Sequence, residues 1–166
     1  MKRIAVAFGL VLALVAGTAQ AQRNEVSVYG AWNSLSSGGM DLDISIFSLN
    51  YGYYFNQQFV GTIGIGQVDT KAGNGPQSRD YTNVEFGAKF YFGGPFRQGQ
   101  FVPFVDGGIG LWDSRNSKDT SWRIGVGGAY FVTESTSIDP TFSYINIQSS
   151  PKTNGHIIGL RFTTRF

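Results

Sequence analysis

The sequence predicts an all-β fold, an eight-stranded antiparallel up-and-down transmembrane β-barrel. Three observations lead to this fold class. The chain begins with an apolar export segment, the remainder alternates between polar and apolar residues in stretches of about 10 to 14, and no stretch after the export segment reaches about eighteen consecutive apolar residues. Only helices and closed barrels can cross a bilayer, so export and alternation together indicate a barrel. A soluble sandwich, with its polar faces in water, is the alternative.

The first 21 residues have the pattern of a secretory signal peptide. Lys2 and Arg3 precede an apolar run from Ile4 to Ala16, and Ala19-Gln20-Ala21 supplies the small residues of a cleavage site. The run is roughly thirteen residues long, shorter than the about 20 that a membrane-spanning helix needs. We therefore expect cleavage after Ala21, which leaves residues 22–166 as a single outer-membrane β-barrel domain.

Composition excludes several other classes. The chain has no cysteine, so neither a disulfide nor a lipid attached to cysteine is expected. It has 13 basic and 11 acidic residues, and Lys2 and Arg3 belong to the predicted signal peptide. The exported part is then formally neutral, which gives no support to nucleic-acid binding.

The segment at residues 155–166 has the clearest two-residue period. Leu160 and Phe162 fall on one face, whereas Arg161 and Arg165 fall on the other. In a membrane barrel the apolar face contacts lipid and the arginines face a polar lumen. Seven earlier segments alternate in the same way, at residues 25–33, 41–55, 59–69, 80–92, 101–113, 119–132 and 137–148.

Within residues 41–55 the apolar positions change parity. Ile44 and Ile46 share one face, whereas Phe47 and Leu49 share the other. A β-bulge near Ile46 and Phe47 would bring these residues onto one face, so we predict a bulge there.

The connections and aromatic residues predict an orientation. With a periplasmic N-terminus, loops at 35–40, 70–79, 114–118 and 149–154 are external, and turns at 56–58, 93–100 and 133–136 are periplasmic. Many tyrosine and phenylalanine residues fall at the periplasmic ends of the segments, and all three tryptophans fall at the external ends, Trp112 among them. Two aromatic girdles are typical of a membrane barrel. Residues assigned to these interfaces are Trp32, Tyr53, Trp122 and Tyr130.

Charged residues on the inward faces predict a network in the lumen. Side chains fill the interior of an eight-stranded barrel, so buried charges must pair. Neighbouring segments place Glu25 opposite Arg165, and Lys89 at the height of Asp106. Asp139 adjoins the segment with Arg161 and Arg165, and Glu85 and Arg123 lie nearer mid-height. We interpret the set as structural, with a gate or small pore as the alternative: Glu25, Glu85, Lys89, Asp106, Arg123, Asp139, Arg161 and Arg165.

The segment Tyr51-Gly52-Tyr53-Tyr54-Phe55-Asn56 before a short turn, and the terminal LRFTTRF, add to these patterns. With them the chain resembles the small eight-stranded outer-membrane barrels of the OmpX and OmpA transmembrane-domain type. The resemblance covers residues 22–166 and concerns architecture, not activity. It implies that Phe166 belongs to the signal read by the outer-membrane assembly machinery. We expect no peptidoglycan-binding domain of the OmpA kind.

The chain also resembles lipid A deacylases of the PagL type in size. That family places a histidine and a serine two residues apart on the seventh strand, and residues 142–149 contain no histidine. The sole histidine, His156, has no serine two residues away, so a catalytic triad is not assembled. No histidine or cysteine cluster suggests a metal, and residues 70–79 lack a phosphate-loop spacing. We expect no enzyme activity, no cofactor and no metal.

The sequence thus predicts a monomeric integral outer-membrane protein whose lumen is plugged by its own side chains. Its role would be structural or surface-interacting, with outer-membrane lipid and lipopolysaccharide as partners. A narrow channel or small-hydrophobe transporter is the first alternative, and a lipid A-modifying enzyme is the second. Five basic residues in or beside the external loops could meet lipopolysaccharide phosphates, although solvated loop charges are the interpretation we favour: Lys71, Arg79, Arg115, Lys118 and Lys152.

Overall fold

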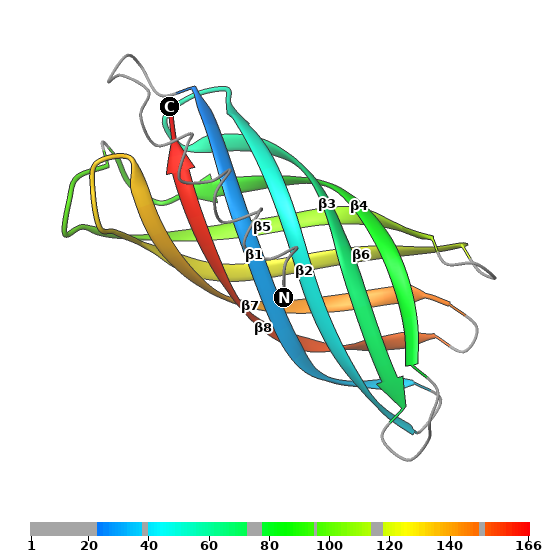
Figure 1. Cartoon of the computed structure of the whole chain (residues 1–166). Coiled ribbons are helices and arrows are strands. Elements are labelled where there is room, and N and C mark those ends of the chain that lie inside the picture. Colours follow the sequence, from blue (N-terminus) through cyan, green and yellow to red (C-terminus); the bar gives the residue numbers. More distant parts are fainter. Residues whose placement is uncertain (1–22, 38–39, 73–77, 95, 114–117, 150–151) are drawn as a thin grey trace, which may run out of the picture.

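The computed structural model describes residues 23–37, 40–72, 78–94, 96–113, 118–149 and 152–166 (Figure 1). The predicted signal peptide lies outside these residues. The strands are β1 (Asn24–Ser37), β2 (Met40–Tyr54), β3 (Phe59–Ala72), β4 (Ser78–Tyr91), β5 (Phe101–Asp113), β6 (Lys118–Phe131), β7 (Thr136–Gln148) and β8 (Thr153–Arg165). Among the residues described, no helix is long and apolar enough to span a membrane.

The strands form one closed barrel. Each strand pairs antiparallel with the next, and β8 returns to pair with β1. In Figure 1 these two strands lie side by side, red against blue. The predicted eight-stranded up-and-down barrel is confirmed. We call the end with the β1–β2, β3–β4, β5–β6 and β7–β8 connections the loop end, and the opposite end the turn end.

Strand alternation divides the residues between wall and lumen as predicted. On β8, Ile158 and Phe162 are exposed on the outer wall, whereas Ile157, Arg161 and Arg165 are buried inside. Because successive strand residues point to opposite faces, each strand contributes one row to the apolar outer wall and one row to the lumen. The outer wall therefore carries most of the large apolar side chains that remain exposed.

The predicted bulge in β2 is wrong. Ile46 pairs with Ala31 on β1 and Val68 on β3, and the next residue, Phe47, continues both ladders without an extra residue. Ile46 is buried and Phe47 is exposed, so the two residues lie on opposite faces. The apolar positions change parity because this part of the lumen is itself apolar, not because the strand is bulged.

Strands at the loop end are longer than the sequence pattern indicates. Residues 35–40 were expected to form a loop, but β1 continues to Ser37 and β2 begins at Met40. The ladder still pairs Leu35 with Leu42. The sequence pattern shows where the apolar part of the outer wall ends. The hydrogen-bonded strands continue past that point with polar residues, which is why the loop was predicted too long.

Side chains fill the lumen in three layers. An apolar cluster occupies the loop end and an aromatic cluster occupies the turn end. Charged residues lie between the two clusters and, at Lys89 and Arg165, against the rings of the aromatic cluster. The loop-end cluster comprises Tyr29, Ala31, Leu35, Ile44, Ile46, Val68, Trp112, Ile145, Ile147 and Ile157, with Tyr81 packed against it. The turn-end cluster comprises Tyr54, Val60, Tyr91, Val102, Phe104, Ala129 and Phe131, with Phe96 packed against it.

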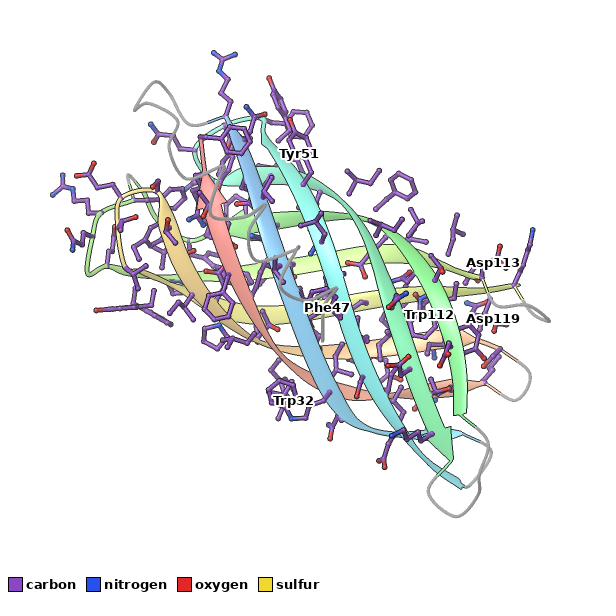
Figure 2. All side chains as sticks on the ribbon, viewed as in Figure 1. Trp32, Phe47, Tyr51, Trp112, Asp113 and Asp119 are labelled. Atoms are coloured by element: carbon purple, nitrogen blue, oxygen red, sulfur yellow. The ribbon has the colours of Figure 1, made fainter. Side chains whose placement is uncertain are left out.

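Trp112 does not belong to the outer aromatic girdle. It is 2% exposed, lies in the loop-end cluster, and its ring centroid is 5.8 Å from that of Tyr81. Trp32, by contrast, is 58% exposed on the outer wall (Figure 2). The positions of all three tryptophans near strand ends suggested an outer girdle. Trp112, however, is on the face of β5 that points into the lumen, and this face decides its location.

Candidate functional site

The charged lumen is the candidate functional site. The structure brings all eight predicted residues into six ion pairs of 4.0 Å or less. They form two groups, each with two cations and two carboxylates. The turn-end group is Glu25, Lys89, Asp139 and Arg165. The loop-end group is Glu85, Asp106, Arg123 and Arg161. Each group is formally neutral, which is what burial of charge requires.

Glu25 is the hub of the turn-end group. Lys89 Nζ lies 2.7 Å from Glu25 Oε1, and Arg165 Nε lies 3.7 Å from Glu25 Oε2. Lys89 Nζ also lies 4.0 Å from Asp139 Oδ2. All four side chains are at most 2% exposed. The expected proximity of Glu25 and Arg165 across the β1–β8 seam is therefore observed, and Lys89 reaches the same carboxylate from β4.

Two buried tyrosines complete this group, and the sequence reasoning missed both. Tyr54 Oη donates to Glu25 Oε2 at 2.7 Å and accepts from Arg165 Nε at 2.7 Å. Tyr91 Oη accepts from Lys89 Nζ at 2.9 Å and from Arg165 at 2.8 Å. The sequence could have indicated that both tyrosines face the lumen, because Tyr54 lies two residues from Gly52 and Tyr91 lies two residues from Lys89, so each pair shares a face of its strand.

Asp139 is hydrogen-bonded by two hydroxyl groups. Ser137 Oγ donates to it at 2.5 Å, and Thr163 Oγ1 donates at 2.8 Å. Arg165 donates to the same Ser137 hydroxyl at 3.1 Å. Asp139 thus contacts β8 as expected, but through Thr163, and it reaches the arginine through a serine.

The loop-end group centres on Asp106 and Arg123. Arg123 donates to Glu85 Oε1 at 2.9 Å and to Asp106 Oδ2 at 3.0 Å. Arg161 donates to the same Asp106 oxygen at 3.0 Å. Lys89 does lie opposite Asp106 in the β4–β5 register, but the ion pairs of Lys89 go to Glu25 and Asp139. Long side chains such as that of Lys89 cross the lumen, whereas Glu25 and Arg165 pair between adjacent strands.

An aromatic plug closes the turn end. The β4–β5 connection folds Phe96 back over the lumen, where its ring stacks on Phe131 at 4.8 Å between centroids. Arg165 lies 4.5 Å from the Phe131 centroid and 5.1 Å from that of Phe96. Gly99, with a φ of 76°, donates its N–H to the Phe131 carbonyl at 2.7 Å. Sequence reasoning predicted only a turn at residues 93–100.

Inward glycines provide the space that these large side chains occupy. A Cβ at Gly125 would lie 2.8 Å from Asp106 Oδ1, and a Cβ at Gly108 would lie 3.0 Å from Glu85 Cγ. A Cβ at Gly159 would collide with the ring of Tyr29. The missing side chains on one strand thus make room for charged or aromatic side chains from another.

The predicted interface and assembly residues lie on the wall and at the seam. Trp32, Tyr53, Trp122 and Tyr130 are all exposed on the outer face. Phe166 donates its N–H to the Asn24 carbonyl at 2.9 Å, and its carbonyl accepts from Asn24 at 3.0 Å. The final residue therefore extends the β1–β8 ladder that closes the barrel.

His156 has aromatic neighbours instead of catalytic ones. Its ring stacks on Phe142 at 5.1 Å and lies edge-on to Tyr144 at 5.4 Å, on the outer face. Ser143, on the adjacent strand, points into the lumen and accepts from Arg123 at 3.2 Å. Within the described part of the chain, no group of three or more His, Asp or Glu residues could hold a metal ion.

Comparisons with known proteins agree with this architecture. Residues 6–166 match the family model described as the outer membrane protein beta-barrel domain. The fold is similar to that of Neisserial surface protein A, with a TM-score of 0.67 and 14% identity over 86% of this chain and 97% of that chain. It is also similar to Ail of Yersinia pestis, with a TM-score of 0.56 and 18% identity over 89% of this chain and 100% of that chain.

The outer membrane enzyme PagL is a third structural neighbour, with a TM-score of 0.58 and 14% identity over 84% of this chain and 99% of that chain. No curated protein sequence matches the chain. At these identities the structural likenesses show the fold alone. Together with the closed eight-stranded barrel, the family match shows that this chain belongs to the outer membrane protein β-barrel domain family and is an outer-membrane protein.

Proposed function

We propose that this protein is a sealed, non-conducting barrel with a structural or surface-interacting role in the outer membrane. The observation that supports this most is the three-layered filling of the lumen. Any solute entering from the loop end would meet the apolar cluster, then the paired charges, then the Phe96 plug. Conduction would require displacement of side chains in all three layers.

The charged layer is a barrier instead of an ion path. Lys89 and Arg165 are each engaged by carboxylate and tyrosine oxygens, and their side chains are at most 1% exposed. Breaking a buried ion pair costs about 3–5 kcal/mol. A passing ion would have to exchange with such partners at both groups, which favours a closed barrel.

The loop-end rim supports the surface-interacting part of the proposal. Lys71, Lys118 and Lys152 are exposed there, as are Asp69, Asp80 and Asp113. The side chains of Arg79 and Arg115 lie outside the described residues. We propose that this mixed-charge rim contacts lipopolysaccharide headgroups, that the outer wall contacts lipid, and that the protein is a monomer. The assembly machinery would engage the strand that ends at Phe166.

Single-channel recording in planar bilayers tests the sealed barrel. Folded protein, verified by heat-modifiable electrophoretic mobility, is expected to show no persistent open state. A matched variant, Phe96→Ala with Arg165→Ala, removes the plug and the cation that it covers, and is also expected to show no persistent open state, because the apolar cluster and the loop-end charged group remain. A long-lived open state in the unsubstituted protein would refute the proposal.

One observation favours passage of small hydrophobes as the second candidate. A groove of about 820 Å³ lies on the outer face at β3, β4 and β5. Its lining is Tyr81, Val84, Phe86 and Leu111 together with the polar residues Gln67, Asp69, Asp80, Thr82 and Asp113. The same Tyr81 packs against Trp112 inside the lumen, so one side chain contacts both the groove and the apolar cluster. Faster uptake of a small aliphatic substrate by cells carrying Tyr81→Ala, relative to the outward-facing control Tyr130→Ala, would favour this candidate.

A further inference from the structure

The outer-face groove at β3, β4 and β5 combines an apolar floor with a negatively charged upper part. Its volume of about 820 Å³ is within the range of about 300–1,000 Å³ that is typical of ligand sites. Three carboxylates line it, Asp69 on β3, Asp80 on β4 and Asp113 on β5, and Figure 2 shows Asp113 at the loop end of its strand. Among the described residues that line the groove, none is basic.

The strand register brings the three carboxylates together. Asp69 is directly opposite Asp80 in the β3–β4 ladder, and Asp113 is opposite Thr82, which is two residues from Asp80. All three aspartates are exposed, and within the described ranges none of them forms an ion pair. Like charges directly opposite each other destabilise a sheet. A cationic ligand at this place would therefore relieve a repulsion that the described side chains leave in place.

The basic residues at the same end do not line the groove. Lys71 is opposite Asp43 in the β2–β3 ladder, and Lys118 is opposite Asp113 in the β5–β6 ladder. Both lysines are exposed, and neither forms an ion pair within the described part of the chain. The side chain of Arg79 lies outside the described residues. The lining of the groove thus keeps a negative charge beside two solvated lysines.

The floor of the groove is continuous with the lipid-facing wall. Val84 and Leu111 are paired in the β4–β5 ladder, and Phe86 follows Val84 on the same face of β4. Phe86 is 53% exposed and Leu111 is 52% exposed. From Asp80 to Phe86 the outward positions of β4 change from charged to apolar over about 20 Å. A ligand that follows the strand would meet carboxylates at one end and apolar side chains at the other.

We propose that this groove binds a membrane amphiphile with one alkyl chain and a positively charged amine head group. The ammonium group lies beside Asp69 and Asp80, and the alkyl chain lies on Val84, Phe86 and Leu111. Such binding combines buried apolar area with electrostatic attraction. An anionic amphiphile would be repelled by the carboxylates, and among the described residues no group of three or more His, Asp or Glu could hold a metal ion instead.

Paramagnetic relaxation in methyl NMR spectra tests the site with the full barrel in phosphatidylcholine nanodiscs. The probes are dodecyl chains with a nitroxide at the chain end and an ammonium, a hydroxyl or a carboxylate head group. The ammonium probe should enhance relaxation of Val84 and Leu111 more than that of Val126 and Ile158, which are exposed elsewhere on the outer wall. Equal enhancement of all four residues by the ammonium probe would overturn the proposal. So would equal binding of the ammonium and hydroxyl probes, which would indicate an unselective apolar groove.

Substitution of the carboxylates separates the charge from the groove itself. Asp69→Asn with Asp80→Asn should weaken binding of the ammonium probe about threefold to tenfold, since each exposed ion pair contributes modestly. Glu134→Gln, at an exposed carboxylate of the turn end, is the matched control and should change nothing. Unchanged binding in the double variant would refute the role of the carboxylates. If that variant does not fold, the unsubstituted protein still decides, because added salt must weaken binding of the ammonium probe and leave the hydroxyl probe unaffected. Bilayer recordings report on the lumen alone, so failure of this site and failure of the sealed barrel are distinguishable.

Discussion

Lys89→Met tests whether the turn-end group stabilises the barrel through paired charge. Lys89 Nζ lies 2.7 Å from Glu25 Oε1 and 2.9 Å from Tyr91 Oη, and its side chain is 1% exposed. Methionine is one atom shorter than lysine and removes the charge, which leaves Glu25 with Arg165 as its only ion-pair partner among the described residues. Removing one member of a buried pair costs about 3–5 kcal/mol. Because Arg165 and Tyr54 remain, we expect about 3 kcal/mol.

The assay is equilibrium unfolding of the refolded protein in lipid vesicles by urea, followed by tryptophan fluorescence. Lys152→Met, at an exposed lysine, is the matched control and should change the free energy of unfolding by less than about 0.5 kcal/mol. Adding Glu25→Gln to Lys89→Met removes the uncompensated carboxylate, so the double variant should be less destabilised than the sum of the two single variants. A Lys89→Met protein as stable as the control would refute the argument, and strict additivity would show that the two charges do not interact.

Three further predictions concern the tryptophans, the last residue of the β1–β8 ladder and His156. Brominated lipids should quench the fluorescence of Trp32 and Trp122 but not that of Trp112, measured in variants with a single tryptophan; equal quenching of Trp112 would contradict its burial in the lumen. Phe166→Ser should reduce the fraction of heat-modifiable protein in outer membranes, with Phe162→Ser as the control for loss of a wall aromatic, and equal losses would remove any special role for the last residue. His156→Ala should leave the mass spectrum of lipid A unchanged in cells that express the protein, and a mass shift lost on this substitution would establish an enzyme.

The alternation of inward and outward residues along each strand made most of the barrel predictable from the sequence. Strand alternation depends only on the local backbone, so the inward location of Arg161 and the outward location of Phe162 could be inferred from sequence. The proximity of Glu25 to Arg165 was also accessible, because closing the barrel makes their strands neighbours. Contacts across the lumen could not be inferred from the sequence, because Lys89 and Glu25 lie on β4 and β1, which share no ladder. The return of Phe96 to the lumen likewise depends on tertiary packing, which no local pattern encodes.

The buried charges of the lumen also help to fix the register of the strands. On β2, apolar residues occupy both faces, with Ile44 and Ile46 inside and Phe47 and Leu49 outside, so hydrophobicity alone does not fix which face meets the lipid. A slip of one residue exchanges the two faces of a strand. On β8 such a slip would turn Arg161 and Arg165 toward the outer face, at about 2–4 kcal/mol for an arginine near the bilayer midplane and less for Arg165 at the strand end. It would also remove one ion-pair partner each from Asp106 and Glu25. The two neutral groups therefore penalise a slipped register on β8 in two ways, through the arginines that it exposes and through the ion pairs that it breaks.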